Sequence, residues 1–204
     1  MKQTVGIRTY KRSECVVFHK TKEAFGALSN MAPGFPILIN NHHILTSEAL
    51  YQACRFPNNP EAQELIISQT SPMTAKMRAK PLKEQTRADW MKVRVRIMRW
   101  CLSAKLLQNY STFSKILIDT QDRSLVEHSS KDRFWGALPT GEDTLVGANV
   151  LGRLLMELRK SVQDGSFNTE LLCPPEVINF LLNGSLIGDM YPVGVKNSIS
   201  DLFE

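Results

Sequence analysis

With 204 residues, 43% of them hydrophobic and 22% charged, the chain has the size and balance of one globular domain, which excludes a disordered protein. No apolar run reaches the roughly 18 residues that a transmembrane helix needs, and the first residues lack the apolar segment of a secretory signal, so we expect a cytoplasmic protein without a membrane partner. The net charge of +5 and the isoelectric point of about 9.1 are compatible with a nucleic acid or a phosphate-bearing ligand, but many cytosolic proteins that bind neither are equally basic.

Strand-like segments come first along the chain. The segment Glu14–His19 (E-C-V-V-F-H) predicts a first short strand. Two further apolar segments, F-P-I-L-I at residues 35–39 and H-H-I-L at residues 42–45, predict a hairpin. Asn40 and Asn41 lie between them, and asparagine tolerates the positive φ that a tight hairpin turn needs.

Three helices are predicted next, over residues 47–56, 61–69 and 72–80. Thr46 or Ser47 supplies the N-cap of the first helix, which ends before Pro57. Ser71 followed by Pro72 is typical of an N-cap with proline at the first helical position.

The longest predicted helix covers residues 88–109. Apolar side chains recur in it at steps of three and four residues and predict a buried stripe of Trp90, Val93, Ile97, Cys101, Ala104 and Leu107. The basic residues fall mostly off this stripe, which favours an ordinary solvated face over a nucleic-acid footprint. They are Lys92, Arg94, Arg96, Arg99 and Lys105.

The remaining elements are a short helix over residues 112–119, a strand over 125–128 and a strong helix over 149–160. After Ser161 the composition changes to a linker-like stretch and then to prolines and glycines, with one possible helix at Pro175–Leu182. We therefore expect residues 161–204 to form an appendage that packs on the domain or meets a partner.

A metal site or a disulfide framework is not expected. The four cysteines, Cys15, Cys54, Cys101 and Cys173, are scattered, with no C-x-x-C pair and no histidine nearby at ligand spacing. His42 and His43 are adjacent and would point to opposite faces of a strand, which makes them poor joint ligands. We expect neither a metal nor a cofactor.

The helix at residues 47–56 carries the first candidate for chemistry. Glu48, Gln52 and Arg55 are spaced i, i+4 and i+7 and therefore share one helical face. A carboxylate at Glu48 could stabilise a positively charged ribosyl transition state or activate water. The spacing alone favours a plainer role, in which a first-turn glutamate offsets the helix dipole.

Three other clusters could each bind substrate or have a purely structural role. Gly147, Asn149 and Gly152 open an amphipathic helix, whose exposed N–H groups could attract phosphate, although glycine before a helix usually just ends a loop. Asp132 and Arg133, followed by Phe134 and Trp135, offer a carboxylate, a guanidinium and a stacking ring, or simply a surface ion pair beside buried aromatic residues. In F-G-A-L-S-N (Phe25–Asn30), Asn30 could bond a sugar hydroxyl, or its own backbone as in many turns.

Taken in order, these segments resemble the motifs of the NADAR (YbiA-like) family. The matching segments are L-S-N-M, T-S-E-A-L-Y-Q-A-C-R-F, W-M-K-V-R-V-R-I-M-R-W-C-L-S-A-K-L, D-R-F-W-G and G-A-N-V-L-G-R-L-L-M-E-L-R. The resemblance covers about Glu14 to Lys160 and implies a catalytic domain at residues 1–160. It also implies an α/β (α+β) fold, predominantly helical in a single domain around a small β-sheet.

The resemblance implies hydrolysis of an N-glycosidic bond to ribose and assigns roles to residues of this chain. Glu48 and Asp132 become the acidic candidates, with Arg55 beside them. Substrate-binding roles are expected for Asn30, Phe25, Gln52, Trp90, Arg133, Trp135, Gly147, Asn149 and Gly152. Many family members have lysine where this chain has Arg55, and arginine cannot act as an amine nucleophile or a proton shuttle. If the family lysine only clamps a phosphate or Glu48, Arg55 can replace it, and we expect retained activity.

Two substrate branches are known in the family. One removes ADP-ribose from guanine in DNA, which reverses a DNA-modifying toxin, and the other cleaves ribosylated pyrimidine phosphate intermediates of riboflavin biosynthesis. We expect the first, with ADP-ribosylated nucleic acid as partner, an antitoxin-like role and a functional pairing with an ADP-ribosyltransferase toxin. The alternatives are the riboflavin intermediate and a non-catalytic module that only binds ADP-ribose.

Overall fold

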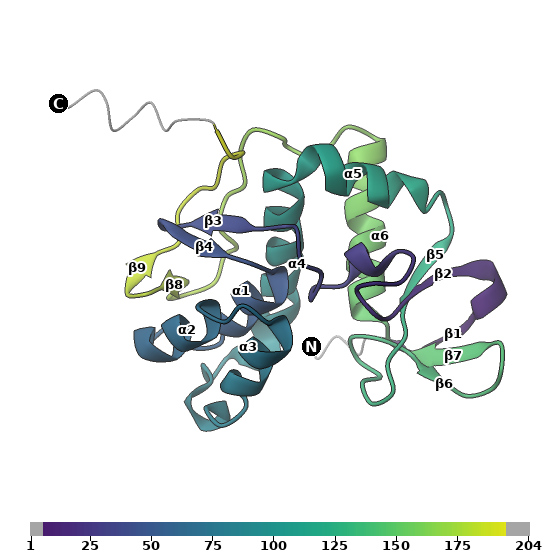
Figure 1. Cartoon of the computed structure of the whole chain (residues 1–204), viewed down its shortest axis with the longest axis horizontal. Coiled ribbons are helices and arrows are strands. Elements are labelled where there is room, and N and C mark those ends of the chain that lie inside the picture. Colours follow the sequence, from purple (N-terminus) through teal and green to yellow (C-terminus); the bar gives the residue numbers. More distant parts are fainter. Residues whose placement is uncertain (1–5, 195–204) are drawn as a thin grey trace.

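Helices make up most of the regular secondary structure, and the strands gather in small sheets at the edges of the fold (Figure 1). The computed structural model describes residues 6–194. Its helices are α1 (Ser47–Ala53), α2 (Pro60–Ile67), α3 (Pro72–Ala79), α4 (Trp90–Gln108), α5 (Tyr110–Asp119) and α6 (Val150–Gln163). The expected α/β fold, predominantly helical around a small β-sheet component, is confirmed.

The strands form several small sheets instead of one. The predicted first strand is β2 (Cys15–Phe18), which pairs in parallel with β5 (Ser124–Glu127), also predicted. A second sheet has the order β1-β7-β6, with antiparallel pairing throughout. Its strands, β1 (Arg8–Lys11), β6 (Leu138–Pro139) and β7 (Thr144–Gly147), were not predicted from the sequence. They are short, and the single buried residue of β1, Tyr10, gives no alternating pattern to recognise.

The predicted hairpin is confirmed as β3 (Ile37–Ile39) and β4 (His42–Ile44), in antiparallel pairing. Asn40 and Asn41 have φ of 47° and 63°, so both occupy the left-handed region that a two-residue hairpin turn requires.

The helix caps follow the sequence signals closely. The Thr46 hydroxyl accepts the backbone N–H of Ala49 at 3.2 Å, and the Ser71 hydroxyl accepts that of Thr74 at 3.4 Å. The first helix ends earlier than expected, at Ala53, because the backbone N–H groups of Arg55 and Phe56 bond three residues back and tighten the chain into a turn.

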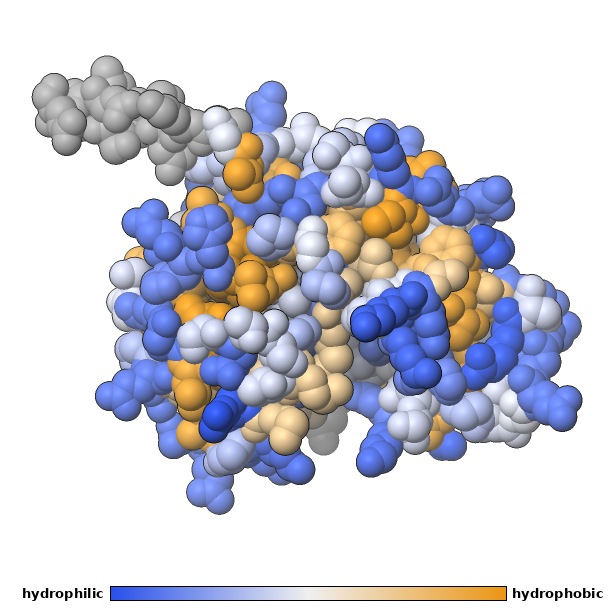
Figure 2. Space-filling model, in the orientation of Figure 1, coloured by the Kyte–Doolittle hydropathy of each residue, from blue (hydrophilic) through white to orange (hydrophobic). Residues whose placement is uncertain are grey.

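Helix α4 forms the centre of the fold and packs against α1, α5 and α6 (Figure 1). From Val93 to Leu107 its predicted apolar stripe is buried, whereas Trp90 is only partly buried. The solvated basic face was predicted wrongly at Lys105, which is 1% exposed. Figure 2 shows that hydrophilic residues surround the visible face, with hydrophobic residues showing between them nearer its centre.

After α6, residues 164–194 return along α2 and α4, and this described part of the tail forms no helix. The predicted helix at Pro175–Leu182 is wrong, because two asparagines of this region adopt positive φ and the chain turns into the short hairpin β8 (Leu181–Leu182) and β9 (Ser185–Leu186). The Gln63 amide donates to the Leu181 carbonyl at 2.8 Å and ties this hairpin to α2. Helix α6 runs across residue 160, the expected domain boundary, and the division into 1–160 and 161–204 stays a prediction; residues 195–204 lie outside the described range.

Within residues 6–194, none of the helices has the length and apolarity needed to cross a membrane.

Candidate active site

A cavity of about 290 Å³ lies between α1, α3, α4 and the segment that follows β5. Its lining combines charged, amide and aromatic side chains. The carboxylates are Glu48, Glu127 and Asp132, the cations are Arg55, Lys76 and Arg94, the amides are Asn30 and Gln52, and the aromatic residues are Tyr51, Trp90 and Trp135. The cavity therefore unites residues from all five sequence motifs, the last of them through Leu151.

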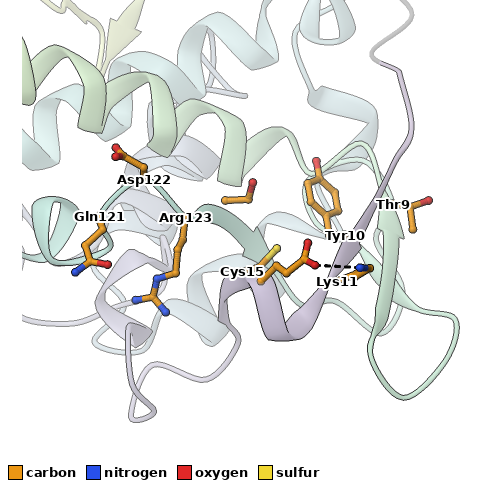
Figure 3. Close-up of a pocket in the computed structure, with 9 residues that line it drawn as sticks. Thr9, Tyr10, Lys11, Cys15, Gln121, Asp122 and Arg123 are labelled. Carbon is orange, nitrogen blue, oxygen red and sulfur yellow. Dashed lines mark hydrogen bonds and ion pairs between the residues drawn. The ribbon is translucent and has the colours of Figure 1, made fainter.

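A larger depression, of about 930 Å³, lies elsewhere on the surface, between β1, β2 and the segment 121–124 (Figure 3). Its charged groups include Lys11 and Glu14, which form an ion pair of 3.0 Å with side chains 65% and 67% exposed. It contains none of the residues that the motifs single out. We therefore take the smaller, more enclosed cavity as the candidate active site.

The expected polar face of α1 is present as a chain of hydrogen bonds. Gln52 Nε2 donates to Glu48 Oε1 at 2.9 Å, and Arg55 Nη1 donates to Gln52 Oε1 at 2.9 Å. Arg55 Nη2 also donates to the Thr86 hydroxyl at 3.1 Å. Burial lowers the pKa of Arg55, but the guanidinium stays charged at any physiological pH. Glu48 is thus held in one orientation by a side-chain network that continues to the segment before α4.

Asn30 fixes the start of the same helix. Its backbone carbonyl accepts the N–H of Glu48 at 3.0 Å and the hydroxyl of Ser47 at 3.2 Å. Its side-chain oxygen also accepts the Ser47 hydroxyl at 3.2 Å. The predicted residue therefore lies in the pocket, and most of its polar contacts position Glu48.

Lys76, on α3, faces Glu48 across the pocket. Its Nζ lies 3.8 Å from Glu48 Oε1, and its side chain is 56% exposed while that of Glu48 is 8% exposed. Lys76 could not be predicted as a site residue from the sequence, because a lysine on an amphipathic helix is ordinarily a solvated residue and only the packing of α3 on α1 brings this one to the pocket.

Glu127, the last residue of β5, is a second carboxyl group that the sequence analysis missed. Burial, reinforced by the nearby charge of Glu48, raises the pKa of Glu127 to about 7. A carboxyl group with such a pKa can give up a proton near neutral pH. No local pattern distinguishes it, since a glutamate at the end of a short strand is common; its position next to the D-R-F-W-G loop was the only available signal.

Asp132 shapes the loop that carries the site's aromatic residues. Its Oδ1 accepts the backbone N–H groups of Phe134 at 2.8 Å and of Trp135 at 2.9 Å. Its own backbone N–H donates to the Ser129 hydroxyl at 2.9 Å. Asp132 lines the pocket, but its Oδ1 is already hydrogen-bonded to the backbone of the turn.

Tyr51 joins the two predicted site tryptophans into one aromatic wall. Its ring centroid lies 5.0 Å from that of Trp90 and 5.6 Å from that of Trp135. Burial and the charge of Glu48 raise the pKa of Tyr51 well above its usual range, so its phenol remains a neutral hydrogen-bond donor.

The backbone N–H groups at the start of α6, expected to attract phosphate, are engaged within the protein, and the binding roles of Gly147, Asn149 and Gly152 stay predictions. The backbone N–H groups of residues 148–151 donate to the carbonyls of residues 133–136 and are not free to bind an anion. Asn149 is fully buried, and its amide bonds the Leu125 carbonyl and the Glu127 N–H. A side chain at Gly147 would clash with the Gly136 carbonyl, and one at Gly152 with the Leu125 carbonyl. These three residues serve close packing of backbone around the site.

Two further predicted binding residues lie outside the cavity. Phe25 has a φ of 59° and is absent from the lining, and the Arg123 guanidinium carbon lies 5.8 Å from its ring centroid. The side chain of Arg133 is exposed, and its backbone carbonyl faces α6, where it accepts the N–H of Ala148 at 2.7 Å.

Comparison with known proteins adds a family assignment to this geometry. The family model described as the NADAR domain matches residues 17–163. The N-glycosidase YbiA of Escherichia coli is 34% identical over 145 residues, which cover 71% of this chain and 86% of that protein. The N-glycosidase Npun_R5314 of Nostoc punctiforme is 32% identical and covers 73% of this chain and 93% of its own. The NMR structure of E. coli YbiA superposes with a TM-score of 0.62 at 30% identity, over 76% of this chain and 92% of that one.

A longer relative has a different name. The riboflavin biosynthesis protein VVA0006 of Vibrio vulnificus is 32% identical over 78% of this chain, but the match spans only 41% of that protein. The similarity therefore concerns one part of the Vibrio protein.

Proposed function

The chain belongs to the NADAR domain family, and from this premise we propose that it is a hydrolase that cleaves the N-glycosidic bond between a ribose and a base. One observation carries the proposal: the buried carboxyl group of Glu48 and the partly buried carboxyl group of Glu127 line one pocket beside an aromatic wall. Cleavage of this bond requires an anion beside the ribose, where positive charge develops, and an acid beside the leaving nitrogen.

The two carboxyl groups have different surroundings, which suits them to these two roles. The Glu48 carboxylate, fixed by Gln52, stabilises the developing positive charge on the ribose and orients a water molecule toward the anomeric carbon. Glu127 gives its proton to the base nitrogen as the bond between carbon and nitrogen breaks. The water forms the new carbon–oxygen bond and passes its proton to Glu48, and exchange with solvent restores both groups. In this scheme Asp132, the acid suggested by the motifs, supports the loop of Trp135.

Arg55 fits this scheme as a clamp. Its hydrogen bond to Gln52 continues the contact between Gln52 and Glu48, so a permanent cation at the end of the chain keeps the carboxylate in place. The replacement of the usual lysine by arginine is then compatible with turnover.

We favour ADP-ribosylated guanine in DNA as the substrate and an antitoxin-like role beside an ADP-ribosyltransferase. The support is electrostatic, since the net charge is +5 and exposed cations lie on or just after α3 and on the loop before Trp135, the two segments that contribute Lys76 and Asp132 to the pocket lining. They are Lys76, Arg78, Lys80, Lys131 and Arg133. A substrate within a polyanion would be attracted to this rim.

A second candidate substrate is a ribosylated pyrimidine phosphate intermediate of riboflavin biosynthesis. It is favoured by the names of two relatives, the Vibrio protein and the riboflavin biosynthesis protein PYRR of Zea mays, which is 33% identical over 72% of this chain. The match spans 25% of the maize protein. The name of that protein therefore suggests a candidate substrate for this chain.

The deciding experiment offers both substrates to the purified protein. Release of free ADP-ribose from an oligonucleotide that carries ADP-ribosylated guanine would support the first substrate. Release of base from the pyrimidine compound alone would support the second. Binding of the modified oligonucleotide without release of either product would refute hydrolysis and identify a module that only binds ADP-ribose.

A further inference from the structure

The aromatic wall of the pocket continues beyond the tryptophans and has an arginine at each end. Phe134 extends it past Trp135, with a centroid separation of 5.0 Å and nearly perpendicular rings. At the other end, the Arg55 guanidinium carbon lies 5.6 Å from the ring centroid of Trp90. Arg94, on α4, lies over Phe134, with its guanidinium carbon 3.7 Å from the ring centroid.

The two arginines differ in what their N–H groups contact. Arg55 donates to Gln52 and Thr86 and is committed to the Glu48 network. The Arg94 guanidinium carbon lies over the rings of Phe134 and Trp135, at 3.7 and 5.9 Å from their centroids, and no carboxylate or carbonyl within residues 6–194 accepts a hydrogen bond from it. A guanidinium stacked on a ring directs its N–H groups sideways, in its own plane, where they match two oxygens of an anion.

The stacking partner of Arg94 is itself held in place. Asp132 Oδ1 accepts the backbone N–H of Phe134 at 2.8 Å, and the Phe134 carbonyl accepts the N–H of Val150 at 3.0 Å. The ring therefore belongs to a loop fixed on one side by Asp132 and on the other by the start of α6. A guanidinium supported in this way loses little conformational freedom when it binds an anion.

We propose that Arg94 is the anion-binding residue of the pocket and that it recognises a phosphate group carried by the ribose of the substrate. This inference rests on the proposed N-glycosidase function and adds the substrate group that the site selects. The start of α6, which could have attracted phosphate by its sequence, is closed because its N–H groups bond the preceding loop. The other two cations of the pocket are engaged, Lys76 with Glu48 and Arg55 with Gln52.

Binding measurements test this inference without relying on turnover. The probes are ribose 5-phosphate, ribose and ADP-ribose, titrated by calorimetry or by NMR into the wild-type protein and its variants. For Arg94→Met we expect about ten- to a hundredfold weaker binding of ribose 5-phosphate, the range for loss of charge-assisted hydrogen bonds, and an unchanged response to ribose. Arg94→Lys should also bind ribose 5-phosphate more weakly than the wild type, because lysine keeps the charge but not the planar pair of donors.

Two more variants separate the local geometry from net charge. Phe134→Leu removes the ring under the guanidinium and should weaken ribose 5-phosphate binding by a smaller factor than Arg94→Met. Arg99→Met removes the same charge from the same helix, outside the pocket, where Arg99 forms an exposed ion pair with Glu157 at 2.9 Å. Arg99→Met should therefore bind all three probes like the wild type.

These binding measurements test the role of Arg94 separately from the proposed hydrolase activity. Wild-type affinity for ribose 5-phosphate in Arg94→Met, or an equal loss for ribose, would overturn the role of Arg94 even if the enzyme is active. Absence of any difference between ribose and ribose 5-phosphate in the wild type would overturn it as well. A larger loss for ADP-ribose than for ribose 5-phosphate would support a pyrophosphate contact, and an equal loss would support a single phosphate contact.

Discussion

The backbone N–H of Glu127 donates a hydrogen bond of 3.0 Å to Oδ1 of Asn149, which is fully buried. The other end of the same amide donates to the Leu125 carbonyl at 2.8 Å. Asn149 therefore connects the start of α6 to the end of β5, and it acts on the site by positioning the strand residue that carries a carboxyl group. The sequence motif suggests that Asn149 binds the substrate, but in the structure its side chain bonds the backbone of β5.

Glu48→Gln should abolish hydrolysis with little change in stability. The substitution keeps the shape of the side chain and removes the negative charge that opposes the developing positive charge on the ribose. We expect turnover to fall at least about a hundredfold, the lower range for loss of one such group. Turnover is measured as product release at saturating substrate, and folding by the thermal unfolding midpoint. Glu157→Gln, on the exposed face of α6, is the matched control, and full activity of Glu48→Gln would refute the assignment.

Glu127→Gln should change the pH dependence of the reaction. An acid catalyst works only while protonated, and the pKa of Glu127 is raised to about 7, so kcat of the wild type should decline as the pH rises above about 7. Glutamine has no proton to give, so the variant should show a low rate without that decline. The measurement is kcat from pH 5 to 9 for both proteins. An unchanged alkaline decline in Glu127→Gln would assign it to another group.

Asn149→Ala should reduce stability more than it affects substrate recognition. The substitution leaves the Leu125 carbonyl and the Glu127 N–H without their buried partner and also places alanine at a φ of 48°. We expect a loss of about 2–4 kcal/mol in the free energy of unfolding, measured by urea denaturation. Asn58→Ala, at an exposed position, is the control. If Asn149→Ala is as stable as the wild type but binds ribose 5-phosphate much more weakly, Asn149 binds phosphate, contrary to what its hydrogen bonds indicate.

Lys105 should make stability depend on pH above neutrality. Its ammonium donates to the carbonyls of Ala27 and Ser29 at 2.6 and 3.2 Å, and burial lowers the pKa of Lys105 to about 7 from an ordinary value of 10.5. Between these values the unfolded chain binds more protons at this site than the folded one, so this residue makes the free energy of unfolding rise with pH from about 7 to 10.

The difference in unfolding free energy between the wild type and Lys105→Met should follow that rise, and urea denaturation at several pH values measures it. Lys115→Met, at an exposed position of α5, provides the comparison and should show no such trend. A pH-independent difference between the wild type and Lys105→Met would show that Lys105 keeps an ordinary pKa in the folded protein.

The local signals in the sequence were sufficient for most of the helices and for the hairpin. Thr46, Ser71 and the Asn40–Asn41 pair act on their immediate neighbours through caps and backbone preference, and such effects do not depend on the rest of the chain. The strands of the β1-β7-β6 sheet could not be found in this way, because β1 and β7 are joined by hydrogen bonds between residues more than 130 positions apart.

The sequence by itself determined the shared face of Glu48 and Gln52, since helical periodicity places residues at this spacing together, whereas Arg55 lies after the end of α1 and joins them by its hydrogen bond to Gln52. Only the tertiary structure decided which groups meet that face. Lys76, Glu127 and Arg94 come from three other elements, and each has a local sequence typical of an ordinary surface or strand-end residue. The roles of Asn149 and Gly152 were decided in the same way, because whether a helix start is free to bind an anion depends on which carbonyls pack against it.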